Sequence, residues 1–503
     1  MSPTWVCTSV DEAQLTRIAE LIALKVRVGD LITLTGDLGA GKTTFARALI
    51  RALLDDPAAE VPSPTFTLVQ SYATSRIEVA HFDLYRLNSP DELDEVGFDD
   101  AVAIGLALVE WPERAGDRLH GNHLGIALVS GDSAETRTVT LTPDGAWTAR
   151  LERLREIDGF IADTAGTVRY LQGDASTRAY ARITGEGNAR VLMDSPRMPD
   201  GPPIRDGLPY SRIAHLAEDV TAFHAVGEKL GACGVIVPTV LAFDHAVGLL
   251  LIDDLGDLTF GRALEQGMDQ RALWSAALDG LVDLRAHPPA ERLSIPSCAL
   301  EHVLHSFDRT ALTIEIELLT DWYWPAIKGT PIPTGNKAEF LGLWDAQFNQ
   351  LEKLPLGWVL RDYHSPNLMW LGDGRVGVLD YQDAMRGPWA YDVVSLLQDA
   401  RLDVPETVER DLLAYYRREV ARREPDFDPA AFDYAYAALG AQRNTKLLGI
   451  FTRLAKRDLK PAYLAHIPRI WRYLERDLQH PALADLAHWF DAHCPPENRE
   501  KNS

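Results

Sequence analysis

Two short segments of the sequence carry residue types and spacings that suit phosphate chemistry. The first, residues 36–44, reads GDLGAGKTT and fits the pattern G-x-x-x-x-G-K-T. Its glycines let backbone N–H groups turn toward phosphate oxygens, its lysine reaches the outer phosphates, and its threonine hydroxyl can ligate Mg²⁺. The segment follows the apolar run 31–34 and opens a helical pattern, KTTFARALIRALL. This is the context that a phosphate-binding loop requires.

We therefore expect this loop to bind a nucleotide, with a metal at its threonine. The candidate nucleotide contacts are Gly36, Asp37, Gly39, Ala40, Gly41, Lys42, Thr43 and Thr44. Such a loop also needs a carboxylate on the magnesium side, at the end of a neighbouring strand. Asp83 ends the strand-like run before DLYRL, and Glu110 ends ALVE, so both are candidate metal ligands beside Thr43. The plain alternative for either acid is a solvated carboxylate at a strand end.

The second segment, residues 359–370, reads VLRDYHSPNLMW and separates Asp362 from Asn367 by four residues. An aspartate so placed can accept the proton of an acceptor hydroxyl, and the asparagine can hold Mg²⁺. Asp380 follows at the end of the strand-like run RVGVLD. We predict that Asp362 is the catalytic base and that Asn367 and Asp380 are metal ligands. His364 could also be read as a general base, but holding the turn is the simpler role for it.

The pattern along the chain indicates the elements that must position these residues. Residues 1–150 alternate short β-rich runs with helical stretches, as in an α/β domain. A charged helical run, LERLREIDGFIADT, follows, and we place a linker at 151–157. Residues 158–256 mix β-like segments with one helix, whereas residues 257–503 are mainly helical. The hairpin-like stretch that contains Asp362 also contains GDG, a tight-turn signal, at 372–374.

Bulk properties narrow the class of protein. The chain has 503 residues, 46% of them hydrophobic and 24% charged, which fits a globular protein of two or three domains. We expect a cytoplasmic protein without a membrane partner, because no apolar run reaches about 18 residues and no secretory signal is visible. The four scattered cysteines form no CxxC pair. The formal charge of −23 argues against direct nucleic-acid binding.

The first 150 residues resemble a known family. The motifs GDLGAGKTT, VPSPTFTLV, HFDLYRL and VEWPER occur in the order of the TsaE family, the small ATPase of bacterial threonylcarbamoyladenosine tRNA modification. The resemblance implies that Thr43, Glu110 and Asp83 organise Mg²⁺, that residues 63–66 form a switch-like loop, and that Trp111 lies close to the nucleotide. It also implies ATP as ligand and the proteins of the tRNA modification complex as partners.

Residues of about 158–490 resemble a second family. GDASTRAYARI, VLMDSP, LLIDDLGD, RDYHSPNLMWL and the runs that follow are similar to the aminoglycoside-phosphotransferase superfamily. More narrowly, they resemble its AmgK branch of anomeric N-acetylmuramate/N-acetylglucosamine kinases. The resemblance implies ATP, Mg²⁺ and an amino-sugar substrate, with Asp362 as base and Asn367 and Asp380 on the metal. Residues 252–255 would face adenine, which makes Ile252 and Asp254 candidate nucleotide contacts.

The upstream lobe departs from the protein-kinase pattern. Its β-turn segment GDASTRAY has one glycine, and Met193 stands where the usual phosphate-pairing lysine is expected. Arg178 or Arg182 could bind phosphate instead, because a guanidinium can form a bidentate fork. A surface charge is the alternative for either arginine. In the AmgK branch this departure is ordinary, so it does not indicate an inactive enzyme.

The sequence contains few signals for the residues that recognise the acceptor. Arg443 and Lys446 share one side of the helical run AQRNTKLLGIFTRL, where they could meet sugar hydroxyls or a carboxylate. Asp383 is a third substrate candidate. Contacts within the domain are the alternative for the two cations. Asp392, which precedes an apolar helix, more simply caps that helix.

The sequence thus predicts an α/β P-loop NTPase domain at 1–150, followed after the linker by an α+β bilobal protein-kinase-like domain of the aminoglycoside-phosphotransferase type. Its lobes are expected at 158–256 and 257–503. We expect a bifunctional chain, a TsaE-like ATPase fused to an amino-sugar kinase. Two alternatives remain open. The kinase part could act on an aminoglycoside, choline or another small alcohol, and the N-terminal part could be a nucleotide-dependent binding or scaffold unit.

Overall fold

The chain divides into two compact units, each described here by itself. The computed structural model describes residues 4–119, 122–131, 133, 135–171, 178–185, 187 and 189–499. Unit 1 comprises Met1–Pro196 with Leu241–Asp254, and unit 2 comprises Arg197–Val240 with Leu255–Ser503. Within the described ranges, none of the helices has the length and apolar character needed to span a bilayer.

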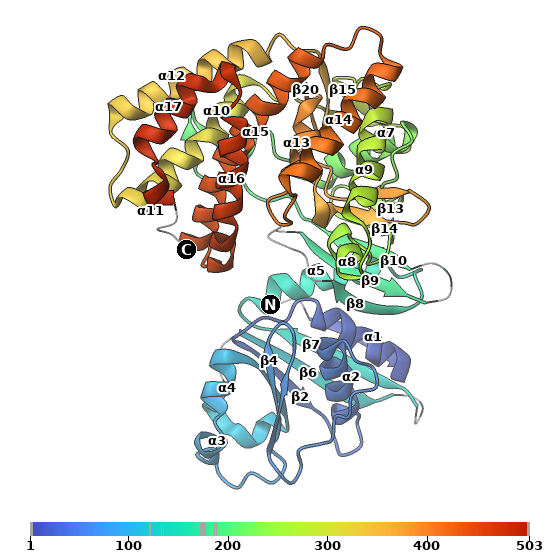
Figure 1. Ribbon diagram of the computed structural model, residues 1–503. Helices are drawn as coiled ribbons and strands as arrows, with labels where there is room; N and C mark the ends of the chain where they lie inside the picture. The colour runs from blue at the N-terminus through green and yellow to red at the C-terminus, as the bar shows by residue number, and fades with distance from the viewer. Residues whose placement is uncertain are drawn as a thin grey trace. The chain divides into compact units, whose positions relative to one another are not determined.

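Unit 1 begins with a seven-stranded sheet in the order β1-β7-β6-β2-β5-β4-β3 (Figure 1). The strands are β1 (Trp5–Val10), β2 (Asp30–Thr35), β3 (Val69–Ala73), β4 (Glu78–Asp83), β5 (Gly105–Glu110), β6 (Asn122–Ser130) and β7 (Arg137–Pro143). The central strands β6, β2, β5 and β4 run parallel, while β7, β1 and β3 add antiparallel edges. The carboxyl ends of β2, β4 and β5 therefore meet at one edge of the sheet.

Helices cover both faces of this sheet, so its central strands are apolar on both sides. On β2, Ile32 and Leu34 pack in one core with helices α1 (Glu12–Ala23) and α2 (Lys42–Leu54). Leu31 faces the opposite core, which α3 (Glu92–Glu95) and α4 (Phe98–Ile104) cover. This is the α/β arrangement expected of the first 150 residues.

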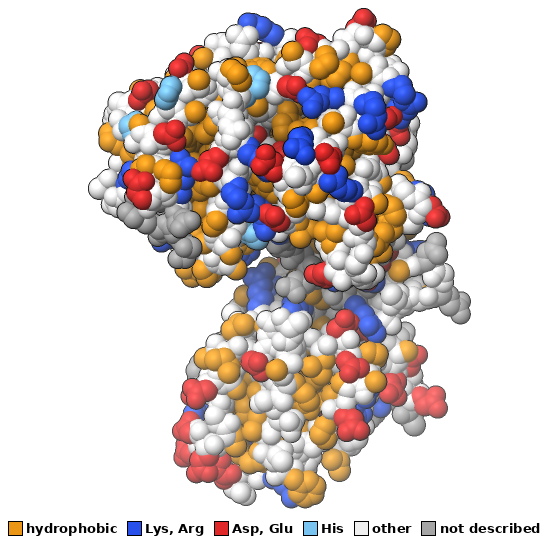
Figure 2. Space-filling model, viewed as in Figure 1, with side chains coloured by type: hydrophobic (Ala, Val, Ile, Leu, Met, Phe, Trp, Pro, Cys, Tyr) orange, Lys and Arg blue, Asp and Glu red, His pale blue; other side chains and the backbone are white. Residues whose placement is uncertain are grey.

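The surface over α3 and α4 is acidic. Figure 2 shows red side chains gathered there, on the blue-coloured part of the chain in Figure 1. The acids of these two helices are Glu92, Asp94, Glu95, Asp99 and Asp100. Such a surface repels the phosphate backbone of nucleic acids, in line with the charge of the whole chain.

A second sheet in unit 1 is five-stranded, in the order β13-β14-β10-β9-β8, and its pairs β14–β10, β10–β9 and β9–β8 are antiparallel. The strands are β8 (Thr167–Leu171), β9 (Ala179–Thr184), β10 (Arg190–Asp194), β13 (Val240–Asp244) and β14 (Leu249–Asp253). Val168, Ile183, Leu192 and Leu251 of this sheet belong to the same buried cluster as Ile18 of α1. The two sheets are thus parts of one hydrophobic core.

Helix α5 (Trp147–Phe160) forms where a charged helical run was expected, but it connects the two sheets through the core and is not the linker predicted at 151–157. Leu151, Leu154 and Ile157 of this helix are fully buried in the shared core. Three apolar side chains at intervals of three residues form a stripe on one face of a helix. The charged residues between them, which suggested a linker, lie on the other faces.

Asp194, at the end of β10, adds ion pairs to the contact between α5 and the second sheet. Its Oδ1 accepts a hydrogen bond from Nη2 of Arg153 on α5 at 2.7 Å, and Lys25, just after α1, pairs with its Oδ2. Arg153 also donates to the carbonyl of Val247 at 2.9 Å. Because Asp194 is buried, these two cations stabilise its charge in the folded unit.

Unit 2 is mainly helical, with α15 (Pro429–Lys456) as its longest helix. Its other helices of eight or more residues are α7 (Val220–Ala232), α9 (Gln270–Leu284), α10 (Arg309–Leu318), α12 (Thr334–Leu351), α13 (Ala390–Leu397), α14 (Glu406–Arg423), α16 (Ile467–Asp477) and α17 (Ala484–His493). Helices α10, α13 and α16 pack against α15. The helical character expected of 257–503 is therefore observed.

Two short antiparallel strand pairs in unit 2 flank the segment that contains Asp362. They pair β17 (Leu356–Val359) with β20 (Met385–Pro388), and β18 (Leu368–Trp370) with β19 (Val376–Val378). The tight turn expected at GDG is confirmed, since Gly372, Asp373 and Gly374 have φ values of 82°, 54° and 76°. Glycine adopts such left-handed φ values most easily, and it occupies two of these three positions.

The division into units differs in part from the expected lobes. The change of unit after Asp254 lies close to the boundary expected after residue 256. Residues 197–240, expected in the first lobe, group with unit 2, and α7 contacts the hairpin β15 (Arg292–Ile295) and β16 (Leu300–Val303). Helix α7, which was expected in the first lobe, therefore packs within unit 2.

Replacing Leu154 with alanine tests the shared core. The change leaves a cavity in the cluster that both sheets contact, so we expect a loss of about 2–5 kcal/mol in the free energy of unfolding of unit 1. Urea denaturation measures this loss. Glu152→Ala, at an exposed position of the same helix, is the control and should change stability by less than about 0.5 kcal/mol. Equal stability of the two variants would contradict a core role for α5.

Candidate functional sites

The first candidate site begins with the loop between β2 and α2. Gly36, Gly39 and Gly41 have φ values of 141°, 83° and 106°. A Cβ on Gly36 would lie 2.3 Å from the carbonyl oxygen of Leu128, and one on Gly41 would lie 2.7 Å from Nε of Arg137. The loop therefore needs glycine both for its left-handed backbone and for space.

Lys42 opens α2 and folds back over the loop. Its Nζ donates to the carbonyl oxygens of Gly36 at 2.7 Å and Asp37 at 2.9 Å, and lies 3.6 Å from the centroid of the Trp111 ring. Burial lowers the pKa of Lys42, although nearby carboxylates, Glu110 foremost, act in the opposite direction. The sequence did not reveal that Trp111 covers this lysine.

The predicted acids meet beside the loop. The parallel register places Asp83 of β4 opposite Glu110 of β5. Oε2 of Glu110 accepts from Thr43 Oγ1 at 3.0 Å, and its Oε1 lies 3.0 Å from Nε2 of His81. Asp83 accepts from Thr65 Oγ1 at 2.8 Å. Thr43, Asp83 and Glu110 thus lie together as expected, whereas the contact of His81 was not predicted.

A pocket of about 340 Å³ opens at this place. Its walls include Gly39, Gly41, Lys42, Thr43, Thr44, Asp83, Glu110 and Trp111. This volume lies at the lower end of the range for small-molecule sites, about 300–1,000 Å³. Ala40 is buried in the core, so its part in the site is to shape the loop.

The second candidate site lies in unit 2, around the short helix η3 (Ser365–Asn367) and the segment after β19. Nδ2 of Asn367 donates to the backbone oxygen of Asp362 at 3.0 Å. The amide of Leu379 donates to the backbone oxygen of Asn367 at 2.8 Å, which places Asp380 next to Asn367. The backbone of the three residues selected from the sequence is therefore joined by these bonds, and Oδ1 of Asp380 accepts from Nε2 of Gln382 at 2.7 Å.

Two buried carboxylates hold the backbone on either side of Asp362. Asp392 accepts from the amides of Leu360 at 2.7 Å and Arg361 at 3.0 Å. Asp399 accepts from the amide of Ser365 at 2.9 Å. Burial raises the pKa of Asp392 to about 7, although these backbone bonds act to lower it.

The helix cap expected of Asp392 is therefore wrong, and Asp399 was not recognised from the sequence. Asp392 lies inside α13, which has no side-chain cap, and its carboxylate reaches the loop before Asp362. Asp399 lies beyond the end of α13 at Leu397, so no helical spacing in the sequence related the two acids.

A buried charge cluster fixes Arg361, the neighbour of Asp362. Arg361 pairs with Glu315, which is fully buried and also accepts from Nζ of Lys446 at 2.8 Å and Nε2 of Gln442 at 3.0 Å. Burial acts to raise the pKa of Glu315, but Lys446 and Arg361 outweigh it and lower the pKa. Lys446, predicted as a substrate contact, is thus engaged in an internal ion pair.

The other two substrate candidates occupy different surroundings. Arg443 is only 3% exposed, and its Nη1 is buried without a hydrogen-bond partner in the described part of the chain. Asp383, the other candidate, accepts from the amide of Ala217 at 2.6 Å.

The charged groups around Asp362 determine the direction of its pKa shift. Burial acts to raise the pKa of Asp362, but the charges of His364, Lys446, Arg443 and Arg361 outweigh it and lower the pKa. Asp362 is therefore ionised at neutral pH.

The nucleotide candidates of the second sheet lie in unit 1. Arg182 pairs with Asp254, with 2.5 Å between Nε and Oδ2, so this candidate replacement for the strand lysine already holds a carboxylate. Met193 and Ile252 are buried on the paired strands β10 and β14. Arg178 directly precedes β9, and the turn residues 173–177 of GDASTRAY lie outside the described residues.

Both sites offer the oxygen ligands that Mg²⁺ prefers. The first has Thr43, Asp83 and Glu110, and the second has Asn367 and Asp380. Across the described ranges, no cluster of three or more His, Cys, Asp and Glu side chains forms a metal cage. Such sparse sets suit Mg²⁺, which keeps waters and is shared with substrate phosphates.

Comparisons with known proteins match the two regions of the chain that contain the candidate sites. Residues 9–139 match the family model described as "Threonylcarbamoyl adenosine biosynthesis protein TsaE", and residues 167–433 match the "Phosphotransferase enzyme family".

Three curated relatives illustrate the similarity. An N-acetylmuramate/N-acetylglucosamine kinase of Caulobacter vibrioides is 38% identical over 65% of this chain and 92% of its own length. The Pseudomonas aeruginosa protein of the same name is 34% identical over 62% of this chain and 84% of its own length. A tRNA threonylcarbamoyladenosine biosynthesis protein TsaE of Rickettsia felis is 43% identical over 20% of this chain and 60% of its own length.

The phosphotransferase model covers more than half of the chain, and the kinase relatives are matched over most of their length. The chain therefore belongs to the phosphotransferase enzyme family and carries a TsaE-family domain before its kinase-like region.

Proposed function

We propose that the chain is a bifunctional protein. Its kinase-like region transfers the γ-phosphate of ATP to the anomeric hydroxyl of N-acetylmuramate or N-acetylglucosamine. Its N-terminal domain is an ATPase with a P-loop that supports threonylcarbamoyladenosine modification of tRNA through protein partners. What supports the kinase proposal is the pair of bonds that join the backbone at Asp362, Asn367 and Leu379, next to Asp380, together with the similarity to N-acetylmuramate/N-acetylglucosamine kinases.

In the kinase reaction, Asp362 would orient the sugar hydroxyl and accept its proton. The cations around Asp362 keep its carboxylate ionised, as a base requires. Asn367 and Asp380 would hold Mg²⁺, whose charge offsets that of the triphosphate. The contacts of Asp392 and Asp399 fix the loop before substrate arrives, so little ordering remains for the reaction.

In the N-terminal domain, Thr43, Asp83 and Glu110 would hold Mg²⁺ beside the loop 36–44. Lys42 would exchange its bonds to the loop carbonyls for bonds to phosphate oxygens. Thr65 is tied to Asp83, so a nucleotide that changes the metal site would also act on the loop near Thr65. A loop that responds to nucleotide is a usual means of controlling a protein partner.

Asp362→Asn should abolish sugar phosphorylation while leaving the fold intact. We expect a fall of about 10²–10⁴-fold in kcat, since the amide cannot accept the proton. The assay follows transfer from γ-labelled ATP to each amino sugar. Asp373→Asn, in the exposed hairpin turn, is the matched control. Unchanged turnover in Asp362→Asn would refute its role, and transfer only to aminoglycosides or choline would refute the acceptor class.

Asp380→Asn should increase the requirement for Mg²⁺. We expect the Mg²⁺ concentration for half-maximal sugar phosphorylation to rise by more than about tenfold, because a charged ligand is lost. The measurement is a Mg²⁺ titration after treatment with EDTA, with Asp373→Asn as control. A titration curve identical to that of the wild type would remove Asp380 from the metal site.

Lys42→Ala should affect the N-terminal domain alone. We expect loss of ATP-dependent association with the tRNA-modification proteins, because the variant lacks the cation that reaches the outer phosphates. Pull-down of the full-length chain with and without ATP measures this loss, and sugar phosphorylation by the same variant is the control for folding. Association at the wild-type level would show that the nucleotide at this loop does not control the partner.

A further inference from the structure

Asp399 links the loop 362–367 to the turn 399–404, which follows α13. Its Oδ2 accepts from the amide of Ser365 at 2.9 Å, and its Oδ1 accepts from two amides of the turn, at 2.8 and 3.2 Å. Asp399 is fully buried. One carboxylate therefore joins the backbone of the turn to that of the loop, so a displacement of the turn also displaces the amide of Ser365.

The amide of Ser365 lies within the segment that holds the proposed base and a proposed metal ligand. Ser365 begins η3, which ends at Asn367. Nδ2 of Asn367 donates to the backbone oxygen of Asp362 at 3.0 Å, and its amide donates to the backbone oxygen of His364 at 2.9 Å. These bonds join the residues before and after Ser365, so the position of its amide affects both Asp362 and Asn367.

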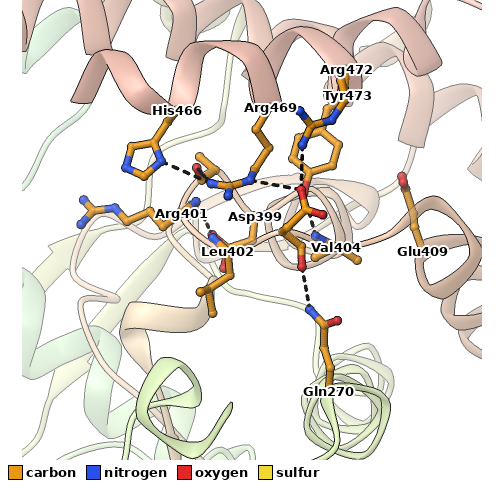
Figure 3. Close-up of polar contacts among 12 residues, drawn as sticks. Gln270, Asp399, Arg401, Leu402, Val404, Glu409, His466, Arg469, Arg472 and Tyr473 are labelled. Atoms are coloured by element: carbon orange, nitrogen blue, oxygen red, sulfur yellow. Dashed lines mark hydrogen bonds and ion pairs between the residues drawn. The ribbon is translucent and has the colours of Figure 1, made fainter. Parts of the chain in front are cut away.

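Helices α16 and α9 hold the turn 399–404 from its other side (Figure 3). Nη1 of Arg469 on α16 donates to the carbonyl oxygen of Ala400 at 3.0 Å. The hydroxyl of Tyr473, also on α16, accepts from the amide of Val404 at 3.1 Å. Gln270 of α9 donates to a backbone oxygen of the same turn at 3.0 Å. The turn is thereby anchored close to both of its ends.

Arg469 and Arg472 of α16 share one partner but differ in a second contact. Oδ1 of Asp403 accepts from Nε of Arg469 at 3.4 Å and from Nη2 of Arg472 at 2.8 Å. Figure 3 shows Arg469 between His466 and Arg472. Within the described part of the chain, Arg469 and not Arg472 reaches the carbonyl of Ala400. The two arginines therefore form a matched pair that isolates this bond.

The bond from Arg469 lies directly beside Asp399 in the chain. Ala400 is only 2% exposed, so water cannot readily replace a lost donor at its carbonyl. A hydrogen bond from a charged donor is also stronger than one between neutral groups. Arg469 is therefore well suited to hold the residue that precedes Ala400 in place.

We propose that Arg469 is a positioning residue of the kinase-like region, which holds the turn 399–404 and, through Asp399, the loop 362–367. The inference rests on the proposed sugar-kinase function. Its physical basis is that the two carboxylate oxygens of Asp399 bind the turn and the loop at the same time. A small displacement of a reacting group costs rate even when the change that causes it lies far from the chemistry.

Steady-state kinetics of the full-length chain tests the role of Arg469. In Arg469→Gln, kcat for phosphorylation of N-acetylmuramate should fall by about 10- to 100-fold, because the base is displaced. KM for ATP and for the sugar should stay within about twofold of the wild type, since no substrate contact is removed. Arg469→Lys, which keeps a charged donor, should recover part of the loss. Arg472→Gln should leave kcat unchanged.

Hydrogen exchange followed by mass spectrometry tests the same contact without the reaction. In the full-length chain without nucleotide or sugar, the amide of Ser365 should exchange about tenfold faster in Arg469→Gln than in the wild type, because its acceptor moves with the turn. Arg472→Gln should exchange at the wild-type rate. Peptides of the loop 36–44 in unit 1 should be unaffected by either change and are the internal control.

The outcomes separate this inference from the proposed function. Equal losses of kcat in Arg469→Gln and Arg472→Gln would attribute the effect to the shared ion pair with Asp403 and would overturn the inference. Unchanged exchange at Ser365 in Arg469→Gln would overturn it as well. If the wild type phosphorylates neither amino sugar, the proposed function falls, and the exchange at Ser365 alone decides whether Arg469 holds the loop.

Discussion

Burial of charge around one loop is the constraint on which the kinase-like region depends. Glu315, Asp392 and Asp399 are buried carboxylates, and each holds a different part of the segment that carries Asp362. Glu315 forms a buried ion pair with Arg361, and removing one partner of such a pair costs about 3–5 kcal/mol. Asp392 and Asp399 instead accept from backbone amides, so the three acids together hold the backbone on both sides of Asp362.

In the N-terminal site, backbone geometry rather than buried acids holds the candidate residues in place. Its geometry comes from glycines that permit a left-handed turn and from parallel strands that end side by side, with Glu110 linked to Thr43 and His81. Helix α5 then connects this domain to the five-stranded sheet through one apolar core and through Arg153 and Asp194. The ATPase-like domain is thereby a structural part of unit 1 rather than a separately tethered domain.

The sequence predicted those features that depend on local spacing. The loop 36–44, the pair Asp362 and Asn367, and the turn at 372–374 are set by residues near one another in the chain, so their patterns were readable. The linker at 151–157 was wrong, because the charged residues that suggested it lie between buried leucines, and only tertiary packing shows which face of α5 is covered.

The remaining omissions involve partners distant in sequence. Asp392 and Asp399 contact a loop about thirty residues away, and Lys446 pairs with Glu315 across 131 residues. Nothing in the sequence around Lys446 indicates that pairing, so an internal ion pair and a substrate contact were equally open.

Phosphorus–proton NMR of the product formed from ATP and N-acetylmuramate tests most directly whether the site around Asp362 transfers phosphate to the anomeric hydroxyl of an amino sugar. We expect a phosphorus nucleus coupled to the anomeric proton of the sugar. Coupling to the protons at carbon 6, or a product mixture of inorganic phosphate and unmodified sugar, would contradict it.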